Sequence, residues 1–309
     1  MINSVLLPIA EVNISPVLLI CIGFSIGLIA GIYGIGGGII AVPVLIFIGI
    51  PTEIAVVTAI NQMTAASFSG YLAYARRERV DYKLSSVMIT GSFLGVMIGV
   101  YIFIKLRQYG YEDLLVNIGF LILLIIVSFF SAKNLFISFY YKYRKTTAQK
   151  NYENLLFYNF HFLQTHYKST KQPLSLIFPW LLGIIGGILT ATMGTSGSLI
   201  MLPVMLYLLK ISTKYIAGTV HFQMIFTTIL ATLLYSLKVI NLDLILSMIL
   251  IIGTVFGTQI GARIGTRFDK ETYKITLSVL ILMLCFKVSL NLFSKPKNPY
   301  ILEIQQKDD

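Results

Sequence analysis

Charged residues are scarce in this chain of 309 residues. Only 12% are Asp, Glu, Lys or Arg, whereas 56% are hydrophobic and the mean hydropathy is +0.82. A soluble domain carries about 25% charged residues, so this composition excludes an ordinary soluble globular fold. It is typical of helical proteins that cross a membrane several times.

Cysteine and enzyme motifs are also scarce. The two cysteines, Cys21 and Cys285, lie in apolar runs without metal-ligand spacing, which argues against a disulfide framework or a metal site. We expect both to be packing residues. No His-Glu-x-x-His, Gly-x-Ser-x-Gly or Walker sequence occurs, so we expect neither an enzyme nor a bound cofactor.

Acidic residues are outnumbered by basic ones, 13 to 24, which gives a net charge of +11. The basic residues stand in short loops between apolar runs, a pattern that favours the lipid bilayer as partner and argues against nucleic acid. Four of the apolar runs are long enough to cross a hydrocarbon core of about 30 Å. They are Leu84–Ile104, Leu114–Ser131, Leu244–Ala262 and Ile275–Phe293.

An internal repeat relates the two halves of the chain. An offset of 160 residues places Gly27 on Gly187, Gly34 on Gly194, Gly37 on Gly197 and Pro43 on Pro203. With two more residues of offset, Asp81 meets Asp243, and Gly91, Gly95 and Gly99 meet Gly253, Gly257 and Gly261. So many matches in order indicate one duplicated unit.

Each unit reads as an apolar hairpin broken by glycines and followed by three helices. The first unit predicts helices at 16–34, 38–50, 53–75, 84–104 and 112–132. The second predicts them at 174–193, 198–210, 213–236, 243–262 and 273–294. The arms at 38–50 and 198–210 are too short for an ordinary full span, so we interpret them as half-helices or re-entrant arms.

The predicted fold is therefore an all-α integral membrane protein made of two inverted repeats. The first repeat covers 1–132, a basic connector 133–173, the second repeat 174–294 and a polar tail 295–309. The loop 76–83 holds four basic residues and the connector seven, with two spans between them, so both are expected in the cytoplasm. Part of the connector, 151–164, reads either as an amphipathic surface helix or as a solvated linker.

The first glycine-rich break, "GIYGIGGGII", is the main candidate for a binding site. Glycines in a helix interior cost about 1 kcal/mol each relative to alanine, so a continuous helix here is unfavourable. A break exposes backbone N–H groups at the start of the next arm, where the helix dipole attracts an anion. The candidate residues are Gly34, Gly36, Gly37 and Gly38, with Pro43 in a structural role.

The second break adds hydroxyl groups to the same pattern. Its candidates are Gly194, Thr195, Ser196, Gly197 and Ser198, and Pro203 corresponds to Pro43. The hydroxyls can donate to an oxyanion, or they can return hydrogen bonds to the broken backbone. The glycines alternatively serve close helix packing alone.

Four polar residues stand deep in apolar segments after the breaks. Asn61 and Gln62 belong to the first half, and His221 and Gln223 to the second, with Asn61 falling on His221 at the offset of 160. Polar groups at this depth are costly, which makes them candidate substrate-binding residues. As a hypothesis, His221 takes up a proton coupled to anion movement; the alternative is a neutral histidine hydrogen-bonded between helices.

Two simpler structural roles are expected elsewhere. Glu53, Asp81 and Asp243 stand at predicted helix starts, where a carboxylate is favourable. The four-residue glycine stripes at 91–99 and 253–261 are typical of closely packed membrane helices.

The two glycine-and-proline blocks, "GIYGIGGGIIAVPVL" and "GILTATMGTSGSLIMLPVM", resemble the TauE/SafE family of sulfite-exporter-like permeases. The following segments "AVVTAINQ" and "IAGTVHFQ" extend the resemblance over nearly the whole chain except the connector and the tails. The resemblance implies a multi-pass transporter of the bacterial cytoplasmic membrane with a small, commonly sulfur-containing anion as substrate. Thr195-Ser196-Gly197-Ser198 departs from the family pattern, in which a glycine run stands.

The expected function is secondary transport of a small anion by alternating access, driven by protons or by the anion's own gradient. Two alternatives stay open: a channel for small anions, and a membrane scaffold that recruits partners through 133–173. No oligomeric state is predicted from the sequence.

Overall fold

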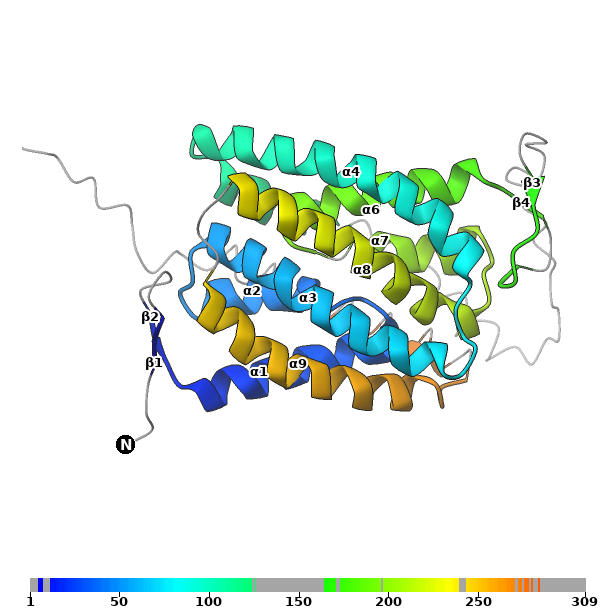
Figure 1. Cartoon of the computed structure of the whole chain (residues 1–309), viewed down its shortest axis with the longest axis horizontal. Coiled ribbons are helices and arrows are strands. Elements are labelled where there is room, and N and C mark those ends of the chain that lie inside the picture. The colour runs from blue at the N-terminus through cyan, green and yellow to red at the C-terminus, as the bar shows by residue number, and fades with distance from the viewer. Residues whose placement is uncertain are drawn as a thin grey trace, which may run out of the picture.

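The structure, a computed structural model, describes residues 5–7, 12–123, 125, 164–170, 173–195, 197–238 and 243–269, and scattered positions between 272 and 283. Helices make up nearly all of this part of the chain (Figure 1). Cys285, Ser196, the tail and most of the candidate amphipathic segment 151–164 lie outside the described residues. The predicted all-α class is confirmed.

The first half contains α1 (Pro16–Tyr33), α2 (Gly38–Phe47), α3 (Thr52–Ala75) and α4 (Tyr82–Gln108), followed by helical residues 112–123. The second contains α6 (Ile177–Met193), α7 (Ser198–Pro203), α8 (Thr213–Lys238) and α9 (Leu244–Gly265). The short π-helix η1 (Val204–Leu208) continues α7. As far as the structure describes them, these helices agree with the predicted ranges within a few residues; most of 124–132 and most of the predicted helix 273–294 lie outside the described residues.

Four helices are long and apolar enough to cross a membrane: Pro16–Tyr33, Tyr82–Gln108, Thr213–Leu237 and Leu244–Gly265. The arms after the two breaks are shorter, as predicted, because α2 has ten residues and α7 with η1 has eleven. Pro43 lies inside α2, and Pro203 lies where α7 gives way to the π-helix. A proline removes a helical hydrogen bond, which is consistent with the irregular turn at this point.

Two small β-hairpins precede the broken helices. Strand β1 (Val5–Leu7) pairs with β2 (Val12–Ile14), and β3 (Gln164–Thr165) pairs with β4 (Leu174–Ser175). Val5 stands opposite Ile14 and Thr165 opposite Leu174, so the pairing repeats at the same offset of 160. The sequence did not predict these hairpins, because strands of two or three residues show no readable alternation.

The central helices α3 and α8 run antiparallel. Thr64 Oγ1 donates to Thr228 Oγ1 at 2.9 Å, and further along α3, Gly70 lies against the ring of the earlier residue His221. Figure 1 shows α3 and α8 between two outer pairs, α1 with α9 and α4 with α6.

The outer pairs are parallel. Gly27 and Gly31 of α1 face the carbonyl groups of Thr254 and Thr258 in α9. In the other pair, Gly91 and Gly95 of α4 face the carbonyl groups of Trp180 and Ile184 in α6. Helix α9 also runs parallel to α3, and α4 parallel to α8, as hydrogen bonds along each pair show. Helices α1, α3 and α4 therefore run opposite to their counterparts α6, α8 and α9, which is the arrangement of an inverted repeat.

The glycine stripes have the packing role that the sequence predicts. Gly253, Gly257 and Gly261 of α9 each lie against a backbone carbonyl group of α1, with no room for a Cβ atom. Membrane helices approach this closely only where small residues line both surfaces. The stripes thus hold α1 of the first half against α9 of the second, and α4 against α6.

Basic side chains gather at one end of the bundle, which we call the basic end. Arg79 donates to the carbonyl oxygen of Thr266 at 3.0 Å, and Lys83 to that of His166 at 3.4 Å, so the end of α3, the end of α9 and the β3–β4 hairpin meet there (Figure 1). The described basic residues of this end are Arg76, Arg77, Arg79, Lys83, Lys168, Lys210, Lys214, Arg263 and Arg267.

Helix starts mostly follow prediction. Asp81 accepts from the N–H of Leu84 at 3.1 Å, and Asp243 from that of Leu246 at 3.0 Å, which confirms both as N-caps. Glu53 lies in the first turn of α3, as predicted, and it also forms an ion pair with Arg107 at 2.8 Å, which the sequence did not predict. Cys21 is a correction, because it lies exposed on the surface of α1.

Candidate substrate-binding site

Both glycine-rich breaks end one helix and turn the chain back. Gly34 and Gly194 occupy the left-handed region, with φ of 77° and 63°, and close α1 and α6 by donating to Ala30 at 2.8 Å and Thr190 at 3.1 Å. Residues other than glycine rarely adopt this conformation. The two turns therefore have the same construction, as the repeat predicts.

The next turn of each break also requires glycine. Gly36, Gly37 and Gly197 have φ of 66°, 86° and 55°. Gly37 packs against Ile26 of the preceding helix, and Gly197 packs against Gly186, which is the counterpart of Ile26 at the offset of 160. Each arm is thereby held against the middle of its own hairpin.

The two breaks meet each other inside the bundle. Gly38, the first residue of α2, faces the carbonyl group of Gly194 so closely that no Cβ atom fits. Ser198, the first residue of α7, donates its hydroxyl to the carbonyl oxygen of Ile35 at 3.1 Å. Gly38 also contacts Met63, at the middle of α3, so the meeting point lies at mid-depth.

Backbone donors are available at this meeting point. The first bonds of α2 run from the N–H groups of Ile40 and Ala41 to the carbonyl oxygen of Gly37. The N–H groups of Gly38 and Ile39 come earlier in the helix, where no intrahelical acceptor exists. The corresponding bonds in the second half run from Ile200 and Met201 to Gly197. Gly37, Gly38, Ile39 and Gly197 are buried, whereas Ile40 and Ile200 are half-buried.

Most hydroxyls of the second break are taken by backbone carbonyl groups. Thr190 donates to Gly186 at 2.7 Å, Thr192 to Ile188 at 2.8 Å, and Thr195 to Leu189 at 3.3 Å. All three acceptors lie within α6, so these hydroxyls bond to helix backbone rather than to carbonyl groups that the break leaves free.

Gln62 and Gln223 occupy equivalent places on either side of the α3–α8 pair. Gln62 Nε2 donates to Thr254 Oγ1 at 2.7 Å, and Gln223 Nε2 donates to Thr227 Oγ1 at 3.0 Å. The Thr254 hydroxyl donates its hydrogen bond to the carbonyl oxygen of Leu250 at 2.7 Å, so Gln62 has to be the donor in its bond with Thr254. Both glutamine side chains are buried, and neither Oε1 atom has a hydrogen-bond partner among the described residues.

His221 lies beside the end of α1. Its ring is fully buried, packs on Gly70 and stacks over Tyr74 with ring centroids 6.0 Å apart. The backbone carbonyl group of Ala30 lies near the ring without hydrogen-bond geometry, and neither ring nitrogen has a partner among the described residues. Asn61 is half-buried on α3.

The structure thus brings the two breaks together and places His221 next to the first one. Ala217, one turn before His221 in α8, lies against Gly34. The two glutamines instead bridge α3 to α9 and α8 to α4 through Thr227, which donates to Ser92 at 2.8 Å. No described contact joins Gln62 or Gln223 to a glycine of the breaks.

A pair of tyrosines completes the site and was missed in the sequence. Tyr74 donates to the carbonyl oxygen of Gly31 at 2.9 Å, and Tyr235 donates to that of Ala191 at 2.6 Å. Gly31 and Ala191 are counterparts at the offset of 160, and the tyrosines are separated by 161. Each hydroxyl satisfies a carbonyl group in the last turn of a broken helix. An alignment of α3 with α8 at an offset of 161, one residue more than the offset of the breaks, would have paired the two tyrosines in the sequence.

Comparison with known proteins identifies the family. Residues 19–288 match the family described as Sulfite exporter TauE/SafE. Two similar proteins of Bacillus subtilis (strain 168) are described as probable membrane transporter proteins, YunE and YjnA. No solved structure matches the chain.

The matched stretches of these relatives are partial. The chain is 33% identical to YunE over 94 residues, which are 28% of this chain and 34% of YunE. It is 26% identical to YjnA over 113 residues, which are 36% of this chain and 44% of YjnA. Because the family match spans most of the chain and both breaks, this protein belongs to the sulfite exporter TauE/SafE family of membrane proteins.

Proposed function

We propose that this protein is a secondary transporter that moves a small anion across the bacterial cytoplasmic membrane by alternating access. The substrate is a sulfur-containing anion such as sulfite, a sulfonate or another organosulfur acid. Membership of the TauE/SafE family and the names of the two relatives support transport, and the family description supports the sulfur anion.

The observation that carries the proposal is the contact between the two breaks at mid-depth. The starts of α2 and α7 come from opposite repeats and meet where Gly38 touches Gly194. Helix starts carry partial positive charge and N–H groups without an acceptor in their own helix, so together they form a cradle for one anion. The cradle consists of Gly34, Gly36, Gly37, Gly38, Gly194, Thr195, Ser196, Gly197 and Ser198, none of which is charged.

The inverted repeat supplies two related conformations. Each break is held by its own hairpin and also contacts the opposite repeat, since Gly34 packs on Ala217 of α8 and Gly194 on Val56 of α3. Exchanging these two sets of contacts opens the cradle first to one side and then to the other. The basic end, with the connector, faces the cytoplasm under the positive-inside rule.

His221 is the proposed site of proton coupling. It is a titratable residue with both ring nitrogens unpartnered among the described residues, and it touches the helix that carries the first break. A proton bound there adds a positive charge next to the end of α1 and thereby strengthens anion binding. Asn61, Gln62 and Gln223 are the other polar residues of α3 and α8 in this proposal, and they line the path of the anion rather than the cradle itself.

Counterflow in proteoliposomes tests the proposal. Vesicles loaded with one unlabelled anion are given a labelled one, using sulfite, sulfate, thiosulfate, sulfoacetate, lactate and chloride, with and without a pH gradient. We expect saturable uptake of a sulfur anion that is stimulated by the anion inside. His221→Gln should keep counterflow and lose the response to the pH gradient.

The other outcomes separate the alternatives. Flux that neither saturates nor responds to the anion inside indicates a channel. Absence of flux for every anion by a folded protein contradicts the proposed substrate class and favours the scaffold. A response of His221→Gln to the pH gradient equal to that of the wild type removes the coupling role from His221 alone.

A further inference from the structure

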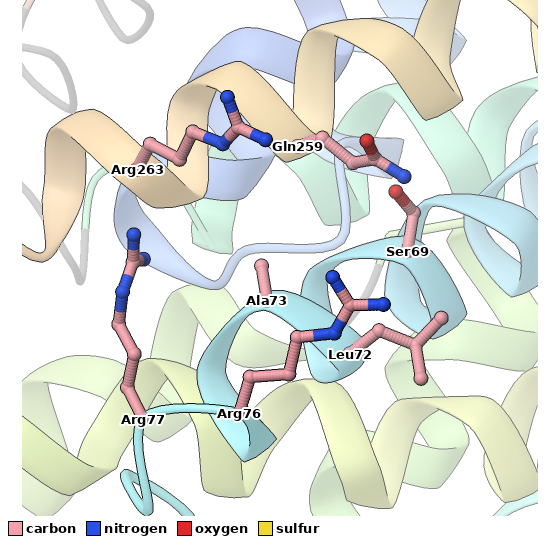
Figure 2. A pocket seen from close by; sticks show the side chains of 7 residues that line it. All are labelled: Ser69, Leu72, Ala73, Arg76, Arg77, Gln259 and Arg263. Carbon is pink, nitrogen blue, oxygen red and sulfur yellow. The ribbon is translucent and has the colours of Figure 1, made fainter.

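A pocket of about 310 Å³ opens between α3 and α9 at the basic end (Figure 2), away from the meeting point of the two breaks. It is lined from the end of α3 and the turn after it, and from the last turns of α9. The lining residues are Ser69, Leu72, Ala73, Arg76, Arg77, Gln259 and Arg263.

Three arginines line this pocket. Figure 2 shows Arg76 and Arg77 on the α3 side, and Arg263 with Gln259 on the α9 side. No acidic residue lines the pocket, and among the described residues none of the three arginines forms an ion pair. Three positive charges around one pocket without an acidic residue favour an anion there.

The positive-inside rule alone explains basic residues at this end, but not why three of them line one pocket without an acidic residue. The three lining arginines and Arg267 are all exposed, but Arg267, which follows the same helix α9, lines no part of the pocket. Gln259 adds an amide donor beside the guanidinium groups, whereas the Ser69 hydroxyl already donates to the carbonyl oxygen of Val255 at 3.1 Å.

Exposed apolar side chains continue from the pocket along both helices. Phe68 lies one turn before Leu72 on α3 and is 53% exposed, and Phe256 lies one turn before Gln259 on α9 and is 63% exposed. These faces of α3 and α9 belong to a membrane protein and therefore face acyl chains. An occupant with an anionic head and an apolar tail matches the pocket and its surroundings, whereas a free anion uses the pocket alone.

We propose that this pocket binds the phosphate headgroup of an anionic phospholipid, with Arg76, Arg77 and Arg263 around the phosphate and the acyl chains along Phe68 and Phe256. Guanidinium groups match phosphate with paired, charge-assisted hydrogen bonds. Basic pockets between membrane helices are known to hold such headgroups.

Native mass spectrometry of the delipidated full-length protein tests this site. The protein is titrated with dioleoylphosphatidylglycerol or, in parallel, with dioleoylphosphatidylcholine. We expect tighter binding of phosphatidylglycerol, and a loss of roughly tenfold or more in Arg263→Gln, since each charge-assisted contact is worth about that factor. Arg267→Gln removes the same charge from the same end and should bind phosphatidylglycerol like the wild type.

Two further measurements make the result decisive. Arg77→Gln repeats the test on the opposite wall of the pocket, in the turn after α3. It replaces Arg263→Gln if that variant has a lower unfolding temperature than the wild type in phosphatidylcholine. Inorganic phosphate and glycerol 3-phosphate are added as competitors, and displacement of the lipid at equal concentration identifies a soluble oxyanion as the occupant. Equal affinity for both lipids, or unchanged binding in both pocket variants, overturns the proposal.

Discussion

Gly38 of α2 lies against the carbonyl group of Gly194, the residue that ends α6 in the opposite repeat. No Cβ atom fits between them, so glycine at position 38 is required by the other half of the chain as well as by its own loop. The Ser198 hydroxyl, which donates to Ile35 at 3.1 Å, joins the same two segments. The two breaks therefore form one site.

Removing the hydroxyl of Tyr235 should loosen the second break. Tyr235→Phe leaves the carbonyl oxygen of Ala191 without its 2.6 Å donor inside the bundle, which costs about 1–3 kcal/mol of unfolding free energy. We expect a lower unfolding temperature in detergent, and slower anion flux because the last turn of α6 is less well held. Tyr109→Phe, at an exposed tyrosine, is the matched control, and equal unfolding temperatures for the two variants would show that the bond contributes nothing.

Gln62 and Thr254 should behave as a coupled pair. Thr254→Val removes the hydroxyl that accepts from Gln62 at 2.7 Å, leaving a buried amide unsatisfied at a cost of about 1–3 kcal/mol. Gln62→Met also removes the amide, so the double variant should be more stable than the sum of the single changes predicts. Thermal unfolding of the four proteins measures this coupling, and strict additivity would refute it.

Asp81 should hold the β3–β4 hairpin to the bundle. Its carboxylate accepts from the N–H of Ser169 at 2.8 Å as well as capping α4. Burial, with the Asp81 carboxylate adding to it, raises the pKa of the neighbouring Tyr167 to about 12, so this phenol stays neutral. Asp81→Ala should lose about 1 kcal/mol of cap stability and release the segment.

Limited trypsin digestion measures the release of the β3–β4 hairpin, because a released hairpin is cleaved faster after Lys168. Asp243→Ala is the symmetric control, because Asp243 caps α9 in the same way but belongs to the other repeat. Equal cleavage after Lys168 in Asp81→Ala and Asp243→Ala would contradict the role of Asp81 as the anchor of the hairpin.

Features carried by local patterns could be predicted from the sequence. The offset of 160 placed Gly34 on Gly194, and apolar length with glycine spacing gave the helices and their close packing. Contacts between distant segments left no such pattern. The tyrosine hydroxyls and the pairing of Glu53 with Arg107 depend on how helices of one repeat pack together. The bond from Gln62 to Thr254 depends on how the two repeats meet, and one sequence displays neither kind of contact.

Cys21 illustrates a different error. Its apolar neighbours suggested a packed residue, but apolar residues of a membrane helix also face lipid, and Cys21 lies on the exposed side of α1. Likewise, the hydroxyl of Thr195 was compatible with a ligand or with a backbone carbonyl group, and only its hydrogen bond to Leu189 reveals the second role.

The central claim is that the starts of the two broken arms hold one anion, and titration calorimetry of the purified protein with sulfite tests it most directly. Gly37 and Gly110 both have positive φ, but a Cβ atom at Gly37 meets Ile26 at 2.7 Å while one at Gly110 meets nothing within 4 Å. Each alanine variant therefore has a backbone strain energy of about 1–2 kcal/mol from its positive φ. Only in Gly37→Ala does the new Cβ atom also push the backbone of the cradle away from Ile26. We predict that Gly110→Ala binds sulfite like the wild type and Gly37→Ala at least about tenfold more weakly; equal binding by all three would contradict the account.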